Sequence, residues 1–140
     1  MAFGTYSQKL VDMSYAGVQL SGKVIGEFCT VELAKDQFTF VADGDGGGCF
    51  VQEADQSGMA KFVLHQQSPS NAAMMSIAAQ QMAGTLGPKA FVVNDRNGSY
   101  QGQTVGYLKR QANTARGESV SNVTWEVVGA QVQQVGGGVA

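Results

Sequence analysis

Residues 59–84 read MAKFVLHQQSPSNAAMMSIAAQQMAG, and this stretch contains both kinds of secondary structure expected in the chain. Ala60, Phe62 and Leu64 lie at alternate positions, which predicts a β-strand over residues 59–66 with these side chains on one face. Because the intervening positions also include a methionine and a valine, the opposite face is partly apolar. We therefore expect this strand to be buried on both faces.

The second half of the stretch predicts the one α-helix of the chain, over about residues 69–83. Ser68 is a suitable N-cap, Pro69 suits the first helical position, and Gly84 is a natural end. The helix carries no charged residue, so it lacks a normally solvated face. We expect it to pack on its own sheet and also on a neighbouring subunit, through Ala73, Met74, Ile77, Ala78 and Gln81.

Outside this stretch, apolar and polar residues alternate over most of the chain, and turns that contain Gly or Asn interrupt them at short intervals. This pattern is typical of an antiparallel, all-β domain. The predicted hairpins join residues 10–15 to 18–20, residues 27–33 to 38–41, and residues 90–93 to 99–108 through a turn at Asp95 to Gly98. Residues 110–117 are expected to form a polar loop, residues 120–128 a final strand, and residues 135–138 a flexible tail.

The composition favours a subunit of a larger assembly. The chain has 140 residues, which suits one domain, and no repeat or composition shift suggests a second one. Charged residues make up only 14% of the chain, well below the usual quarter or so, while the hydrophobic fraction of 44% is ordinary. A surface so poor in charge keeps a monomer soluble less well, so we expect contacts with other copies.

The same composition argues against two classes of protein. With a net charge of −2 and no basic patch, tight binding of nucleic acid is not expected. No stretch approaches the roughly 18 apolar residues that span a bilayer, and no secretory leader is evident. We expect a protein that stays in the cytoplasm of the cell that makes it.

Candidate reactive residues are few. Cys29 and Cys49 lie far apart without the spacing of a metal site, and His65 is the only histidine that could join them. The residues from Asp43 to Gly48 are similar to the opening of a calcium-binding loop, but the closing bidentate acid is missing because Ala54 occupies that position. We interpret this segment as a mobile, exposed loop that orders against a partner.

No enzyme, metal or cofactor is therefore predicted. A small hydrolase or binding module that uses His65 or Cys49 stays as an alternative from a different class.

A series of short motifs gives a more specific indication. In chain order they are Asp36-x-Phe38, Asp45-Gly46, Asp55-x-Ser57-Gly58 and Leu64-x-Gln66-x-Ser68-Pro69-Ser70-Asn71, followed by Asn97-Gly98 and Trp125-Glu126. The order of these motifs resembles that of the tail tube proteins of contractile-tailed bacteriophages, the myovirus-type tube protein family, over nearly the whole chain. The most specific piece is Gln66 to Asn71, just before the helix.

The resemblance implies an antiparallel β-sandwich or partial barrel with one flanking α-helix. It implies a structural role in hexameric rings, whose inner sheets join into a continuous β-barrel around a channel. The rings would stack into a tube similar in plan to that of type VI secretion, and in a phage the tube delivers the genome. The expected partners are other copies of the chain and the tail sheath and baseplate proteins. Viral DNA would pass through the channel without specific binding, and the protein would belong to the tail of the virion.

The resemblance also implies that a long loop, here residues 42–54, contacts the neighbouring ring. Its central residues are Asp43, Gly44, Asp45, Gly46, Gly47, Gly48, Cys49 and Phe50. A baseplate or tube-completion protein of the same fold, which forms a single ring, is the alternative within this class.

Overall fold

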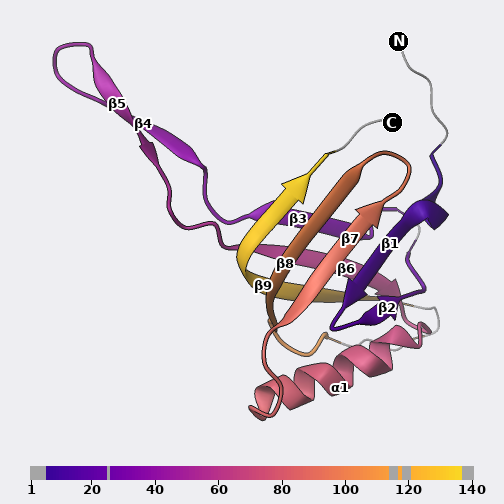
Figure 1. The fold of residues 1–140 in the computed structure, drawn as a ribbon. Helices are drawn as coiled ribbons and strands as arrows, with labels where there is room; N and C mark the ends of the chain where they lie inside the picture. Colours follow the sequence, from indigo (N-terminus) through magenta and orange to yellow (C-terminus); the bar gives the residue numbers. More distant parts are fainter. Residues whose placement is uncertain (1–5, 25, 114–116, 118–120, 137–140) are drawn as a thin grey trace.

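The computed structural model describes residues 6–24, 26–113, 117 and 121–136. Within this part of the chain the protein is mainly β, with antiparallel strands and one flanking α-helix, which confirms the predicted fold class (Figure 1). In chain order the elements are η1 (Gln8–Leu10), β1 (Val11–Tyr15), β2 (Val18–Leu20), β3 (Cys29–Leu33), β4 (Phe38–Ala42), β5 (Gly48–Gln52), β6 (Gly58–His65), α1 (Ser70–Met82), β7 (Lys89–Asp95), β8 (Tyr100–Leu108) and β9 (Asn122–Val135).

Seven strands form one folded-over sheet in the order β2-β1-β7-β8-β9-β6-β3. The sheet folds over along the long strand β9. Residues 122–129 of this strand pair with β6, while its residues 127–135 pair with β8. The sheet therefore has two layers that share β9. We call β1, β7, β8 and the second half of β9 the first layer, and the first half of β9 with β6 and β3 the second layer (Figure 1).

Two glycines allow β9 to pass from one layer to the other. Gly106 of β8 lies opposite Gly129 of β9, beside an irregularity in the pairing that begins at Thr104. A Cβ atom at Gly106 would collide with the carbonyl oxygen of Val128, and one at Gly129 would collide with the hydroxyl of Thr104. The sharp change of direction thus depends on the missing side chains.

The space between the layers is filled by large side chains. Phe62 of β6 and Phe91 of β7, which are not neighbours in the sheet, stack with ring centroids 5.4 Å apart. Trp125 is fully buried, and its Nε1 donates a hydrogen bond to Asn71 Oδ1 at 3.1 Å. These contacts join the second layer both to the first layer and to the start of α1.

Several predicted elements are confirmed and one pairing is wrong. The hairpins β1-β2 and β7-β8 occur as predicted, but β3 does not pair with β4. Instead β3 pairs with β6 and β4 pairs with β5, because the chain continues outward as one long ribbon before it turns back. The last strand extends past Val128 to Val135, since β8 supplies a partner for its second half. Parts of the predicted loop at 110–117 and tail at 135–138, and the residue Val120, lie outside the described residues.

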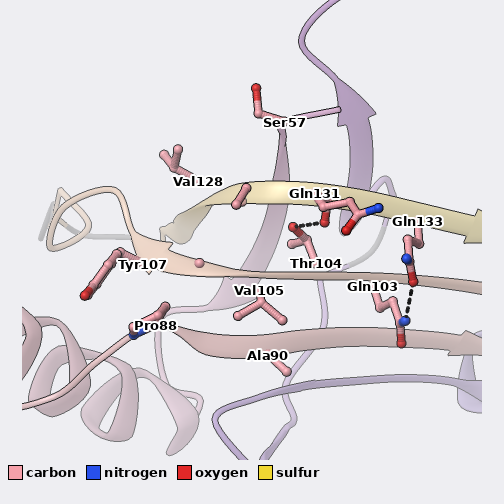
Figure 2. Close-up of a pocket in the computed structure, with 13 residues that line it drawn as sticks. Ser57, Pro88, Ala90, Gln103, Thr104, Val105, Tyr107, Val128, Gln131 and Gln133 are labelled. Atoms are coloured by element: carbon pink, nitrogen blue, oxygen red, sulfur yellow. Dashed lines mark hydrogen bonds between the residues drawn. The ribbon is translucent and has the colours of Figure 1, made fainter. Parts of the chain in front are cut away.

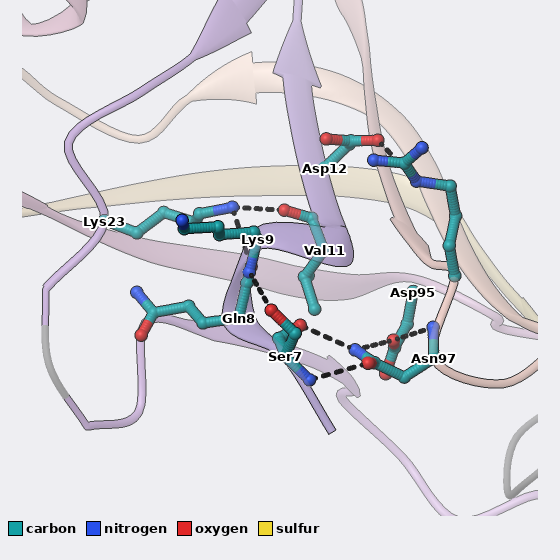
Figure 3. A network of polar contacts seen from close by, with 9 residues as sticks. Ser7, Gln8, Lys9, Val11, Asp12, Lys23, Asp95 and Asn97 are labelled. Carbon is teal, nitrogen blue, oxygen red and sulfur yellow. Dashed lines mark hydrogen bonds and ion pairs between the residues drawn. The ribbon is translucent and has the colours of Figure 1, made fainter. Parts of the chain in front are cut away.

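The chain near the N-terminus is held against the β7-β8 turn (Figure 3). The backbone N–H of Ser7 donates to Asn97 Oδ1 at 2.7 Å, and Asn97 Nδ2 donates to the carbonyl oxygen of Ser7 at 2.9 Å. The ammonium of Lys23 donates to the carbonyl oxygens of Gln8 and Val11. These bonds fix the start of β1, which lies near one edge of the first layer.

Candidate functional site: the arm and the outer faces of the sheet

The hairpin β4-β5 extends away from the rest of the molecule as an arm (Figure 1). The two strands form their own two-stranded sheet, and every residue in them is exposed. Phe38 is 57% exposed, Phe40 56% and Phe50 75%. Phe40 and Phe50 lie opposite each other with ring centroids 5.1 Å apart. Three large aromatic side chains of the arm thus face solvent.

Both faces of the arm are apolar. By register, Phe38, Phe40 and Phe50 lie on one face, while Val41, Cys49 and Val51 lie on the other. An isolated two-stranded hairpin is only marginally stable in water, and exposed apolar patches usually mark interaction sites. The arm therefore has the properties of a segment that another chain covers.

The arm corrects the interpretation of residues 42–54 as a mobile loop. Only Asp43 to Gly47 form the turn, and Gly48, Cys49 and Phe50 belong to β5. Asp43 Oδ1 accepts hydrogen bonds from the backbone N–H groups of Asp45 and Gly47, both at 2.9 Å, and Gly46 has a φ of +89°. A tight turn of Asp and Gly residues closes a strand pair here, which the Gly-rich composition concealed.

The root of the arm is also ordered. The backbone N–H of Glu53 donates to the carbonyl oxygen of Gln37 at 2.8 Å, which continues the pairing of the arm toward the body. Lys35 Nζ lies 3.3 Å from Asp55 Oδ2. Hydrogen bonds from Ser57, together with Lys35, hold the pKa of Asp55 below its ordinary value. The root of the arm is thus held by a backbone hydrogen bond and an ion pair.

The helix residues predicted to contact a neighbour face mostly inward. Met74 and Ala78 are buried in the core of their own chain. Ala73 and Ile77 are partly buried and pack on the same core, and Gln81 bonds within the chain to Tyr15, Gly87 and Leu108. The predicted side of the helix is therefore its inner side. The exposed side is equally free of charge and consists of Ala72, Ser76, Ala79, Gln80 and Met82.

The outer face of the first layer carries no charge on β7, β8 and the second half of β9, all of which are described. We call this surface the amide face. Its outward residues are Ala90, Val92, Asn94, Gln101, Gln103, Val105, Tyr107, Gln131, Gln133 and Val135. Gln103 Nε2 donates to Gln133 Oε1 at 2.7 Å, and Gln131 Nε2 donates to Gln56 Oε1 at 2.9 Å. A hollow of about 740 Å³ lies over this face, beside Val105, Tyr107 and Val128 (Figure 2).

The outer face of the second layer has an ordinary charged surface. Lys61 of β6 lies opposite Glu126 of β9, and Glu32 of β3 and His65 of β6 lie on the same face. Lys109 Nζ also contacts Glu126 Oε2 at 3.5 Å. The outer face of the first layer is thus uncharged except on β1, where Asp12 lies opposite Asn94 and forms an ion pair with Arg96 at 3.2 Å. No periodicity in the sequence indicated this contrast with the second layer.

The candidate reactive residues do not form a site. Cys29 lies opposite Phe62 on the core side of β3, and burial raises the pKa of its thiol to about 12. His65 is exposed on the outer face, and Cys49 lies on the arm. In the described residues no group of three or more possible metal ligands occurs, and no helix there is long and apolar enough to cross a membrane. A nucleophile activated by His65 therefore finds no support in the geometry.

Comparison with known proteins gives similarity in structure alone. No family model matches the sequence, and no curated protein matches it. The tube-terminating cap of the anti-feeding prophage is similar in fold, with a TM-score of 0.65 and 9% identity over 98% of this chain and 95% of the cap chain. The sheath/tube terminator, in the extended state, of the extracellular contractile injection system PVC has a TM-score of 0.68 and 8% identity, over 96% of this chain and 99% of that one. The fold is thus one that tube terminators of contractile machines also have.

Proposed function

We propose that this chain is a non-enzymatic structural protein, with one tail tube-like domain, that forms a ring at the end of the tube of a contractile tail or injection machine. The exposed arm carries this proposal, because no described part of the chain covers its three aromatic side chains. The fold shared with two tube terminators supports the same role. It favours a terminating ring over a repeating tube subunit.

The edges of the sheet support a ring. Residues 132–135 of β9 pair with β8 on one side, and on the other side one backbone bond is described, from Val132 N–H to the carbonyl oxygen of Gln56. At the opposite end of the sheet, β2 is a three-residue edge strand that pairs with β1 on one side, and no further described strand pairs with its other side. Unpaired edges invite pairing with other chains, and a closed ring of copies removes them. A ring of six, as in the tube family, is the arrangement that we propose.

The arm then contacts the next layer of the assembly. In a terminating ring, that layer is the last ring of the tube or the sheath around it. In a stacked tube of identical rings, which is the alternative, the arm contacts the same protein in the next ring. In a phage, such a tube would conduct the genome.

Electron microscopy of the purified full-length protein, with size-exclusion chromatography, tests this proposal. We expect single rings that do not grow into tubes. Long tubes would instead support the repeating tube subunit. A protein that stays monomeric at every concentration, with an intact fold by circular dichroism, would overturn both versions.

A further inference from the structure

We propose that Asn97 is a site of spontaneous deamidation, and that conversion of its side chain releases the N-terminal segment, residues 6–10, from the β7-β8 turn. The inference does not depend on the proposed ring. It rests on the residue that follows Asn97, on the hydrogen bonds of its side-chain amide, and on the charges around that amide.

The turn contains the residue pair that this reaction needs. Asn97 is followed by Gly98, and this is the only Asn-Gly pair in the chain. Because glycine has no side chain, its backbone nitrogen is unhindered. Attack of the Gly98 nitrogen on the side-chain carbonyl carbon of Asn97 closes a five-membered succinimide ring and releases ammonia. Water then opens the ring at either carbonyl, which gives aspartate or isoaspartate, so one water is consumed for each ammonia released and no oxidant is needed.

In the folded chain the N-terminal segment holds the Asn97 amide in place (Figure 3). Oδ1 accepts from the backbone N–H of Ser7 at 2.7 Å, and Nδ2 donates to the carbonyl oxygen of Ser7 at 2.9 Å. Nδ2 also donates to Asp95 Oδ1 at 2.8 Å. Ring closure requires the side chain to turn toward the Gly98 nitrogen, and these bonds oppose that rotation. The rate of conversion therefore depends on how often the N-terminal segment leaves the turn.

The product no longer fits the contacts that the amide makes. A carboxylate oxygen takes the place of Nδ2 and faces the carbonyl oxygen of Ser7 and the carboxylate of Asp95, which both accept from Nδ2 before conversion. Arg96 is the adjacent cation, but it forms its ion pair with Asp12 at 3.2 Å. Acceptors and like charges at this distance repel each other. Isoaspartate also lengthens the backbone of the turn by a methylene group.

The release stops at the start of β1. The backbone N–H of Arg96 donates to the carbonyl oxygen of Leu10 at 2.9 Å, and Lys23 donates to the carbonyl oxygen of Val11. From Val11 onward β1 pairs with β7. We expect residues 6–9 to separate from the turn while the sheet stays intact.

Peptide mapping by mass spectrometry of the full-length protein, stored in mildly alkaline buffer, tests the site. Ser7→Pro removes the N–H that Asn97 Oδ1 accepts, and Ser7→Ala keeps this N–H and is the matched control. We expect aspartate and isoaspartate at position 97, formed about tenfold faster in Ser7→Pro, because the loss of one hydrogen bond raises the opened population by about that factor. Equal rates in the two variants would overturn control by the N-terminal segment. Conversion confined to other asparagines would overturn the site itself.

Hydrogen exchange tests the release. Asn97→Asp reproduces one product directly, and Asn122→Asp adds the same charge at an exposed residue of β9 as the control. We expect the amides of Ser7 and Leu10 to exchange about tenfold faster in Asn97→Asp, with protection of β1 unchanged, and the control to match the unaltered protein. Unchanged exchange at Ser7 and Leu10 would overturn the release. If Asn97→Asp does not fold, the unaltered protein is measured before and after conversion, and the same outcomes decide.

Discussion

At the scale of single residues, the side chain of Gln81 connects α1 to two strands of the first layer, β1 and β8. Its Nε2 donates to the hydroxyl of Tyr15 at 2.8 Å, and its Oε1 accepts from the backbone N–H of Leu108 at 3.0 Å. The same Tyr15 hydroxyl donates to the carbonyl oxygen of Gly106 at 2.8 Å. Because Tyr15 is fully buried, each of these polar groups depends on a partner within the protein.

Replacing Gln81 by Ala should therefore lower the stability of the subunit. The change leaves the N–H of Leu108 without its acceptor, and an unsatisfied buried group costs about 1–3 kcal/mol. Urea denaturation followed by circular dichroism measures the loss. The exposed neighbour Gln80 is the matched control, and Gln80→Ala should change the free energy of unfolding by less than about 0.5 kcal/mol. Equal stability of the two variants would show that the Gln81 network contributes nothing.

Cys29 gives a prediction about alkaline pH. Burial raises the pKa of its thiol from 9.0 to about 12, so the folded state holds this proton more tightly than the unfolded chain does. The resulting stabilisation is fully present below the unfolded pKa and is lost as the pH rises from about 9 toward 12. Burial also raises the pKa of Tyr15, which adds a loss in the same direction above pH 10.

The Cys29→Ala variant isolates the first of these effects. Its melting temperature should fall less steeply between pH 8 and pH 11 than that of the unaltered protein, on the order of a few degrees over this range. The exposed Cys49→Ala variant should follow the unaltered protein. If Cys29→Ala loses stability just as steeply, ionisation of this thiol is not coupled to unfolding.

At the scale of elements, the arm and the helix differ in what the sequence could predict. The boundaries of α1 were close, because Ser68 and Gly84 are local signals, and the helix begins at Ser70 with Ser68 Oγ accepting from the Ser70 N–H at 3.2 Å. The sequence did not show which side of the helix faces the core: Met74 and Ala78, expected partly against a neighbour, are buried in their own chain. In a helix without charge, no polar stripe identifies the exposed side, so only the packing decides it. The arm was missed as a hairpin because Gly48 interrupts the usual strand composition.

Substitutions on the arm should separate folding from assembly. Phe40→Ser combined with Phe50→Ser removes the aromatic pair, whose two rings contact each other outside the core. We expect circular dichroism and melting temperature of the subunit close to those of the unaltered protein, because the core is untouched. Attachment to the next layer of the assembly should be lost. Thr39→Ser on the opposite face of the same strand is the control that keeps attachment, and full attachment of the double variant would exclude the arm as the contact.

Charge placed on the two sides of the helix should have two different effects. Ala78→Asp buries a carboxylate in the core and should destabilise the subunit by at least about 3 kcal/mol or prevent folding. Ala72→Asp and Ala79→Asp lie on the exposed side and should leave the subunit folded, as measured by circular dichroism. If a neighbouring copy covers that side, the pair should also abolish rings in electron microscopy. Normal rings from the pair would show that this side is solvated.

At the scale of the whole molecule, the class of fold was predictable and the topology was not. Alternation of apolar residues identifies strands locally, and turn residues such as Asn97 and Gly98 identify the β7-β8 hairpin. The pairing of β3 with β6 spans an intervening hairpin, and the passage of β9 between layers depends on the facing glycines Gly106 and Gly129. Neither the pairing of β3 with β6 nor the passage of β9 between the layers produces a periodic pattern in the sequence. The amide face was also hidden, because it combines residues from three strands that are adjacent only after folding.

The shared strand β9 has a mechanical consequence. The arm joins the body through β6, and β6 is bonded along its whole length to the first half of β9, from Gly58 opposite Gly129 to His65 opposite Asn122. A tension applied to the arm along these strands would strain that ladder in shear, so that its hydrogen bonds share the load and do not open one after another. The second half of β9 lies in the first layer, and the load would pass there along a single covalent chain. A pull on the outermost hairpin is therefore carried into the first layer of the sheet.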